Sequence, residues 1–208
     1  MFLVMKPAAL LLIALLPALA FAQPSRYDLP ACSGAQRELA DRDFYILCYD
    51  AEHKVPLWTA HEIKPELPHV AASRPRHLRH DNALLGPVAR NADYLHSGYS
   101  RGHLVPAEDM AWSGEAMRST FLLSNTIPQN QSVNAGLWKR LESAVRSAAQ
   151  GSDAAYVITG PVFDAAEVAH IGPGQVAVPT HTFKVVLIVS GERKNYVRRD
   201  HAQRRNWR

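Results

Sequence analysis

The sequence predicts an α+β fold in which an antiparallel sheet is flanked by helices. Residues 44–63 form two extended runs separated by a short polar turn, a pattern typical of an antiparallel hairpin. Residues 134–149 place apolar side chains at three- and four-residue intervals, as on a helix with one buried face. The chain has 208 residues and no repeat or low-complexity tract, so one domain with a real core is expected.

The hairpin consists of an extended run from Phe44 to Tyr49, a polar turn from Asp50 to Lys54 and a second extended run from Val55 to Ile63. Further along the chain, Arg101 to Pro106 is also expected to be extended. Proline disfavours helical backbone at the residue before it, here Val105. His103 is therefore expected on a strand or at its end.

Two shorter elements are expected before the long helix. A short helix is expected to begin at Ser113, with Glu115 supporting its first turn. The run from Phe121 to Asn125 predicts a buried strand, and Pro128 limits helix formation until the next segment. The expected order is therefore strand, short helix, strand and long helix.

The long helix is expected to begin at Asn134 and to end near Gly151, since glycine is favoured just past a helix C-terminus. Its apolar face comprises Leu137, Leu141, Ala144, Val145 and Ala148. From the sequence alone, the Asn134 side chain could cap the helix or direct its oxygen toward a cation, and capping is the simpler interpretation. Glu142 lies about 12 Å further along an ideal helix axis, which disfavours direct binding of one ion by both residues.

Residues 1–22 are predicted to be a signal peptide. They contain one charged residue, Lys6, an apolar run from Ala8 to Leu16, and Ala20-Phe21-Ala22, which has the small-x-small form of a cleavage site. The apolar run is short for a membrane span, so an uncleaved anchor is the weaker alternative, and no other segment is apolar enough to cross a bilayer. The mature protein is expected to begin at Gln23, to be secreted or periplasmic, and to have no stable membrane association.

The chain contains two cysteines, Cys32 and Cys48. Export would expose them to an oxidising compartment, so a disulfide between them is expected. A closed loop of about 16 residues would contribute about 3 kcal/mol to stability in the chain-entropy description. The alternative is a buried, free Cys48 and an exposed Cys32. Neither cysteine lies in a catalytic motif, which excludes thiol chemistry.

The basic residues are unevenly distributed. The formal net charge of +4 fits an anionic partner, but many soluble proteins are equally basic. More informative is the run that contains Arg74, Arg76 and Arg79 together with His77 and His80. Such a run is either a solvated loop or a phosphate-binding surface. We expect phosphate contact, because sequence-independent binding of nucleic acid depends mainly on backbone electrostatics.

The segment Ser100-Arg101-Gly102-His103, followed by Asn125 and by a helix with Asn134 and Glu142, is the most informative in the chain. Cleavage of a phosphodiester bond requires a base that activates water, positive charge at the phosphate and stabilisation of the leaving oxygen. A histidine, an arginine and a cation held by oxygen ligands can supply these three functions.

These segments resemble, in order and approximate spacing, the DNA/RNA non-specific endonuclease family, whose members have a ββα-metal fold. The resemblance extends from Phe44 to Val189. The other segments that carry it are Val55–Ile63, Arg76 with Asp81, Phe121–Gln129, Asn134–Glu142, Tyr156–Phe163 and Thr182–Val189. It implies an endonuclease domain over residues 23–192 that hydrolyses DNA and RNA without strong sequence preference and leaves 5′-phosphate and 3′-hydroxyl ends.

The resemblance also implies roles for individual residues. His103 is the expected general base, and the ordinary histidine pKa near 6.5 suits that role near neutral pH. Asn134 is implied as a direct metal ligand and Glu142 as a ligand through water. Magnesium is the expected ion because it prefers oxygen ligands and retains waters, with Mn²⁺ or Ca²⁺ as substitutes. Asn125 is expected to orient catalytic groups by hydrogen bonding; the alternative is an ordinary turn residue.

The arginines are expected to bind phosphate. Arg76 is the candidate for stabilising transition-state charge through a bidentate contact, and Arg101 is expected to support it. Arg74 and Arg79 are close enough in the sequence to take this role instead. Together with Arg140, they are expected to contact the DNA or RNA substrate.

Two features depart from the family pattern. Ser100 stands where the family usually has aspartate, so a hydrogen bond can be retained but the charge is lost. After Val189 the chain does not resemble the family's ending. Residues 193–208 are strongly basic and lack apolar periodicity, which predicts an irregular or frayed basic tail and a fold whose C-terminal elements are truncated.

The main alternative function is that of a non-catalytic nucleic-acid-binding protein that retains the basic surface. A zinc hydrolase using His77, His80, His96 and His103 is a second alternative, but these spacings match no standard zinc motif. The sequence identifies neither the natural target nor an oligomeric interface, and a homodimer is compatible with it.

Overall fold

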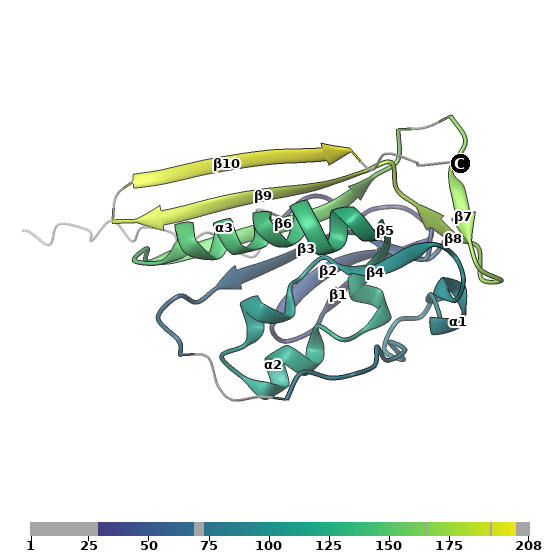
Figure 1. Ribbon diagram of the computed structural model, residues 1–208, viewed down its shortest axis with the longest axis horizontal. Coiled ribbons are helices and arrows are strands. Elements are labelled where there is room, and N and C mark those ends of the chain that lie inside the picture. The colour runs from purple at the N-terminus through teal and green to yellow at the C-terminus, as the bar shows by residue number, and fades with distance from the viewer. Residues whose placement is uncertain (1–28, 69–72, 165, 192, 203–208) are drawn as a thin grey trace, which may run out of the picture. The chain divides into compact units, whose positions relative to one another are not determined.

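A six-stranded antiparallel sheet with the order β1-β2-β3-β6-β9-β10 is the main structural element of the computed structural model (Figure 1). The structure describes residues 29–68, 73–164, 166–191 and 193–202. The strands of this sheet are β1 (Arg37–Asp41), β2 (Tyr45–Asp50), β3 (Val55–Ile63), β6 (Ala154–Val162), β9 (His181–Ser190) and β10 (Arg193–Ala202). The α+β class and the antiparallel sheet are therefore as expected.

Two small antiparallel pairs and several helices complete the described fold. The pairs are β4 (Tyr99–His103) with β5 (Thr126–Asn130), and β7 (Ala169–Ile171) with β8 (Val176–Val178). The helical elements are α1 (Asn91–Tyr94), the 3₁₀ turn η1 (Ala107–Met110), α2 (Gly114–Ser119), the 3₁₀ turn η2 (Leu123–Asn125), the π-helical segment η3 (Val133–Trp138) and α3 (Lys139–Ala149). None of the helices in the described ranges is long and apolar enough to span a membrane.

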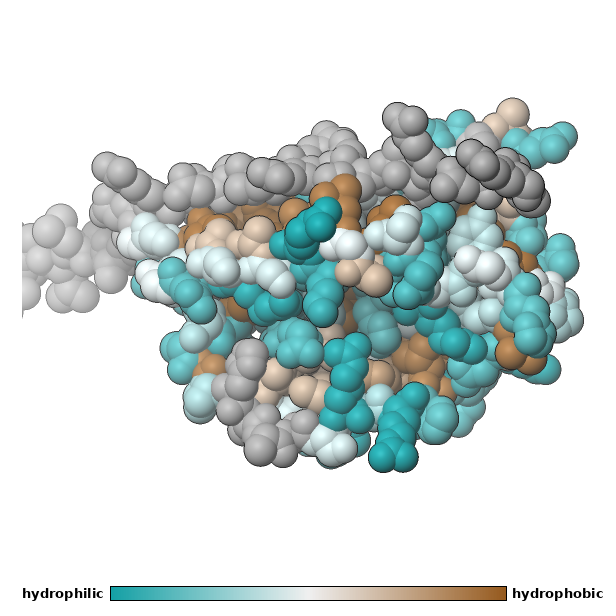
Figure 2. Space-filling view, in the orientation of Figure 1, coloured by the Kyte–Doolittle hydropathy of each residue, from teal (hydrophilic) through white to brown (hydrophobic). Residues whose placement is uncertain are grey.

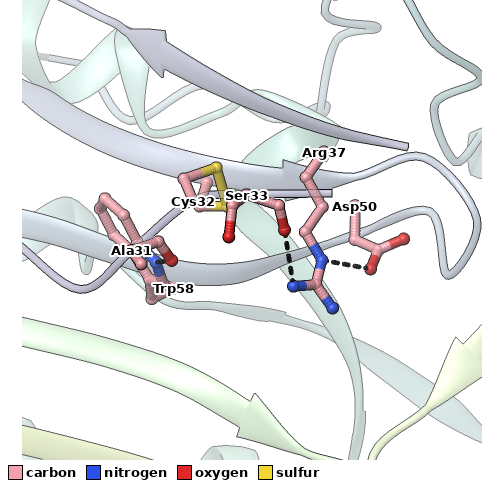
Figure 3. The surroundings of a disulfide bond; sticks show 7 residues. Ala31, Cys32, Ser33, Arg37, Asp50 and Trp58 are labelled. Atoms are coloured by element: carbon pink, nitrogen blue, oxygen red, sulfur yellow. Dashed lines mark hydrogen bonds and ion pairs between the residues drawn. A yellow bond between two sulfur atoms is a disulfide. The ribbon is translucent and has the colours of Figure 1, made fainter. Parts of the chain in front are cut away.

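The predicted hairpin and the predicted disulfide are both confirmed. Strands β2 and β3 pair antiparallel from Tyr45 with His61 to Asp50 with Val55, and a register irregularity follows Cys48. Cys32 forms a disulfide with Cys48, which ties the segment before β1 to β2 (Figure 3). The free-thiol alternative is therefore excluded.

Alternate residues of each strand point to the same side of the sheet, and the residues on one side are buried. Helix α3 runs along β6 and β9 in Figure 1 and packs against the sheet through an apolar cluster. The cluster comprises Ile63, Trp138, Leu141, Val145, Ala149, Ala155, Val157 and Val186. A second cluster joins β2 to the segments around β4, β5 and β8. The surface that carries α2 and α3 is mostly hydrophilic (Figure 2).

The prediction of a strand from Phe121 to Asn125 is wrong. The segment ends in η2, and the strand β5 begins only at Thr126. Its burial has a tertiary cause: the backbone N–H of Arg79 donates to Phe121 O at 2.8 Å, and that of Leu123 donates to Arg79 O at 2.9 Å. Pro128 lies within β5, where a two-stranded pair leaves one side of the strand without ladder hydrogen bonds.

The predicted long helix exists, but its N-terminal part differs from the expectation. Helix α3 ends at Ala149, and Gly151 follows with a φ of 76°, as expected for a helix stop. Asn134 lies inside η3, after Ser132, which already has helical backbone angles. Capping by Asn134 is therefore wrong. Short π-helical segments are frequent at functional sites.

The C-terminal prediction is also wrong for residues 193–202. These ten residues form β10, which pairs with β9 from Arg193 opposite Ser190 to Ala202 opposite His181. Backbone pairing does not require apolar periodicity, and edge strands are commonly rich in charge, which discourages unwanted pairing. The sheet is thus extended rather than truncated at this point. Residues 203–208 and the predicted signal peptide lie outside the described residues.

Candidate active site

A cavity of about 680 Å³ lies beside β4. Three residues selected from the sequence, Arg76, Arg101 and His103, lie together on its wall. The remaining lining residues are His77, Leu78, Asn91, Tyr99, Ser100 and Phe121. The fold thus joins the arginine-containing loop and the Arg-Gly-His segment at one hollow.

Gly102 explains how β4 presents its side chains. Arg101 and His103 share one face of the strand because side chains alternate, and both line the cavity. On the opposite face, a Cβ at Gly102 would lie 2.8 Å from the Cβ of Gln129 on β5, which is too close. Glycine therefore allows β5 to pack directly behind the two cavity residues.

His103 has the protonation state that a general base requires. Burial lowers the pKa of His103, the nearby charge of Arg74 lowers it further, and a hydrogen bond with the Arg101 backbone raises it, giving a pKa of about 4. Its Nε2 is buried without a hydrogen-bond partner in the described residues. Phe121 contacts the ring edge-on, with 5.1 Å between ring centroids. His103 is consequently neutral at pH 7 and has an unused ring nitrogen.

Arg101 is held in place by its neighbours. Its Nη2 donates to Asn91 O at 3.1 Å, and its guanidinium lies 5.3 Å from the centre of the Tyr94 ring. Its buried Nε has no hydrogen-bond partner among the described atoms. Arg76 is exposed on the same cavity. Two permanent cations therefore line the same cavity as the neutral histidine.

The other predicted phosphate contacts differ in position. Arg74 is exposed, pairs with Glu108 at 3.1 Å and lies 5.3 Å from the centre of the Phe121 ring, so it is near the cavity wall. Arg79 donates a side-chain hydrogen bond to Arg118 O at 3.3 Å and is not among the cavity-lining residues. Arg140 is exposed on α3 and is likewise absent from that wall.

Asn125 is fully buried and acts on the backbone. Its Oδ1 accepts from Val105 N at 3.0 Å, and its Nδ2 donates to Val105 O at 3.0 Å and Thr120 O at 2.9 Å. It therefore fixes the segment that directly follows His103. This geometry fits a positioning role better than that of an ordinary turn residue.

Replacing Asn125 with alanine should lower the free energy of unfolding by about 3 kcal/mol, because buried backbone groups lose their partners. Urea denaturation of the purified protein would measure this change. Asn82→Ala is the matched control, since Asn82 is exposed and its Oδ1 pairs with His80 at 2.9 Å. Equal stabilities of the two variants would contradict the positioning role.

Glu142 lies in a charged region that the sequence analysis did not identify. Burial raises the pKa of Glu142 to about 7, although the charge of Lys184 opposes that shift. Lys184 is buried on β9, and its Nζ donates to Thr159 Oγ1 at 2.7 Å. Asp109 binds His61 Nε2 at 2.9 Å and Arg146 Nη1 at 2.8 Å. A charged residue at position 184, within an apolar strand, was the signal available in the sequence.

Asn134 and Glu142 have the donor chemistry of a site for a hard cation. An amide oxygen and a carboxylate suit Mg²⁺, Mn²⁺ or Ca²⁺. The raised pKa of Glu142 shows that its charge is only partly compensated by Lys184 and Arg146, so a cation would stabilise its ionised form. Asn134 is half-buried in η3, in the turn that precedes α3. These residues therefore fit the expected metal.

A second group of metal-binding residue types occurs at the β2–β3 turn. The ligand atoms of Asp50, Glu52 and His53 lie within 4.8 Å of one another. Asp50 already accepts hydrogen bonds from the backbone N–H groups of Glu52 and His53 and lies 3.5 Å from Arg37 Nε. The residues lining the cavity do not include this group. It is therefore separate from the candidate active site.

Several known nucleases are similar to this chain. Human mitochondrial endonuclease G is 37% identical over 175 residues, which cover 79% of this chain and 58% of that protein. Nuclease C1 of Cunninghamella echinulata is 31% identical over 174 residues, or 77% of this chain and 69% of that protein. The mitochondrial nuclease of Saccharomyces cerevisiae is 32% identical over 177 residues, or 78% and 53%. The chain thus spans little more than half the length of the two mitochondrial relatives.

A solved structure of an EndoG/EndoGI complex has the same fold. It aligns with a TM-score of 0.75 and 29% sequence identity, covering 80% of this chain and 74% of the matched chain. In this chain the antiparallel pair β4–β5 is followed by α3, which gives the order strand, strand and helix. The ββα-metal nuclease fold expected from the sequence is therefore confirmed.

The relatives also correct the expected location. The similar endonuclease G from Homo sapiens and the nuclease from Saccharomyces cerevisiae are both named as mitochondrial proteins. The prediction of a secreted or periplasmic protein is contradicted by these relatives. It relied on the short apolar segment before Gln23, and apolar N-terminal sequence does not by itself specify a destination.

The sequence model of one protein family matches nearly the whole chain. It is described as DNA/RNA non-specific endonuclease and matches residues 27–206. That range includes the cavity, the charged region around Glu142 and β10. The chain therefore belongs to the DNA/RNA non-specific endonuclease family.

Proposed function

We propose that this protein is a metal-dependent endonuclease that hydrolyses the phosphodiester bonds of DNA and RNA with little sequence preference and leaves 5′-phosphate ends. The observation that carries the proposal is the cavity in which a neutral His103 lies beside Arg101, each with a buried side-chain nitrogen that has no partner in the described part of the chain. Buried polar groups without partners are unfavourable, so their persistence beside a cavity supports a role in binding substrate or water.

His103 would take the proton from the attacking water at Nε2. Its hydrogen bond with the Arg101 backbone engages the other ring nitrogen, which fixes the ring and leaves Nε2 as the acceptor. The lowered pKa keeps His103 unprotonated at neutral pH. General-base catalysis of this kind contributes about 10²- to 10⁴-fold to a rate.

Arg101 and Arg76 would hold the phosphate. A guanidinium can donate two parallel hydrogen bonds to phosphate oxygens, and its charge opposes the negative charge that increases in the transition state. The contacts with Asn91 and Tyr94 hold Arg101 before substrate arrives, so little reorganisation is needed. Arg74 would extend this positive surface along the nucleic-acid backbone.

Asn134 would hold the cation directly and Glu142 through a water, with Mg²⁺ as the ion that best fits these oxygen donors. Bound there, the cation would reduce the negative charge on the scissile phosphate and stabilise the leaving oxygen. Attack by an external water makes no use of the ribose 2′-hydroxyl. Both DNA and RNA are therefore expected substrates.

Incubation of the protein with supercoiled plasmid and with single-stranded RNA, in Mg²⁺ or in chelator, tests this function. We expect Mg²⁺-dependent cleavage of both substrates and DNA fragments that a ligase rejoins without prior phosphorylation. Fragments that ligate only after treatment with a kinase would contradict the proposed ends. A mobility shift without cleavage in every condition would instead support a non-catalytic nucleic-acid-binding protein.

A further inference from the structure

A charged cluster is buried between the sheet and α3. It consists of His61 on β3, Asp109 on η1, Glu142 and Arg146 on α3, and Lys184 on β9. His61, Asp109 and Lys184 each expose no more than 6% of their surface. Charges buried to this degree are costly unless they are paired, so the arrangement must be specific.

Asp109 connects three parts of the fold through one carboxylate. Its Oδ2 binds His61 Nε2 at 2.9 Å on the sheet, and its Oδ1 accepts from Arg146 Nη1 at 2.8 Å on α3. Asp109 itself belongs to η1, which follows β4 and His103 after a few residues. The carboxylate therefore joins the segment after the proposed base to the helix that carries Glu142.

The hydrogen bonds define the protonation states in this contact. Burial lowers the pKa of His61, although Asp109 opposes that shift, and His61 Nδ1 is buried without a partner in the described residues. A neutral ring that donates from Nε2 satisfies this geometry, whereas a protonated ring would bury an unsatisfied N–H at Nδ1. Burial also opposes ionisation of Asp109, but its bonds with His61 and Arg146 and the charge of Lys184 keep its pKa below the ordinary value.

Two of the cations that act on Glu142, Arg146 and Lys184, are fixed in position. Arg146 lies one helical turn after Glu142 and is held by Asp109 and by Ser143 Oγ at 3.2 Å. Lys184 is held by Thr159 and lies 5.1 Å from the centre of the Trp138 ring. Removal of the Asp109 charge would weaken its contact with Arg146 and leave the cations of the cluster in excess over its anions.

We propose that Asp109 is a positioning residue, which holds the Glu142 face of α3 at a set distance from the segment that follows His103. This inference rests on the proposed function, because it concerns the site in which Glu142 would help to hold a cation. Asp109 acts through Arg146 and His61 and does not itself touch the substrate. Groups bonded directly to metal ligands commonly change metal affinity or activity by about 10- to 100-fold when they are replaced, and Asp109, which acts one residue further out, is expected at the lower end of this range.

The test compares Asp109→Asn with wild type in two assays on the full chain. Mn²⁺ binding, followed by electron paramagnetic resonance, does not depend on activity, and we expect it to weaken about 10-fold in Asp109→Asn. Single-turnover cleavage of a DNA duplex should require a higher Mg²⁺ concentration for half-maximal rate, while DNA affinity in chelator stays within about twofold. Glu115→Gln is the control, because it removes an exposed carboxylate on α2.

Wild-type Mn²⁺ affinity in a folded Asp109→Asn protein would overturn the inference. If Asp109→Asn does not fold, His61→Gln takes its place, since glutamine retains a donor for Asp109 and weakens only the sheet contact. A smaller loss of Mn²⁺ affinity is expected for His61→Gln, and an unchanged affinity would likewise overturn the inference. If wild type binds Mn²⁺ but cuts neither DNA nor RNA, the proposed function fails, while the Mn²⁺ comparison still decides the role of Asp109.

Discussion

Replacing His103 with alanine is expected to lower the rate of DNA cleavage by about 10²- to 10⁴-fold without weakening DNA binding. The rate falls because the attacking water loses its base. Binding persists because a histidine with a pKa of about 4 carries no charge at pH 7, whereas Arg76 and Arg101 remain at the cavity. Initial cleavage rates and fluorescence anisotropy in chelator would measure the two effects.

The control for His103→Ala is His80→Ala, because His80 is exposed and does not line the cavity. We expect His80→Ala to cleave at the wild-type rate, and added imidazole to restore part of the rate of His103→Ala. A His103→Ala protein that retains more than a tenth of the wild-type rate would exclude His103 as the base.

Replacing Glu142 with glutamine should abolish most activity yet stabilise the metal-free protein at alkaline pH. Burial raises the folded-state pKa of Glu142 from 4.5 to about 7. A carboxyl group with a raised pKa contributes most favourably below pH 4.5, and that contribution is lost as the pH rises through 7. The ionised carboxylate consequently costs about 3 kcal/mol at pH 8, and glutamine removes this cost.

Urea denaturation in chelator at pH 4.5 and pH 8 would measure this effect. Glu142→Gln should match the stability of wild type at pH 4.5 and exceed it at pH 8, whereas Glu115→Gln, at an exposed position, should match it at both values. Saturating Mg²⁺ should reverse the order at pH 8, because a cation that binds the folded state stabilises wild type. A Glu142→Gln protein that is less stable than wild type at pH 8 in chelator would show that Glu142 stabilises the metal-free fold.

Local patterns in the sequence were sufficient to predict the elements that depend on local interactions. The hairpin of β2 and β3 follows from two extended runs and a polar turn, and α3 follows from its apolar periodicity. Strand β10 could not be predicted in this way, because its residues show no apolar alternation and only its pairing with β9 defines it as a strand. The segment Phe121–Asn125 is buried by its contacts with Arg79 and Val105, so its apolar character indicated burial but not the strand.

The candidate site was predictable where a short motif carries its chemistry. Arg101 and His103 are two residues apart on one strand, and Arg76 was recognised in a basic run; the fold brings all three to one cavity. Asp109, His61 and Lys184 were not predicted, because they come from three elements, η1, β3 and β9, that meet only in the folded protein. Their significance lies in contacts between distant residues, which no local pattern records.

A double-mutant cycle of His103→Ala and Glu142→Gln tests most directly whether the base and the metal-binding face form one hydrolytic site. The measurement is the single-turnover rate of DNA cleavage at saturating Mg²⁺. Residues that act as one unit are strongly non-additive, so we expect the double variant to be about as slow as the slower single variant. A double variant whose loss equals the product of the two single losses would show that His103 and Glu142 act independently and would contradict a single site.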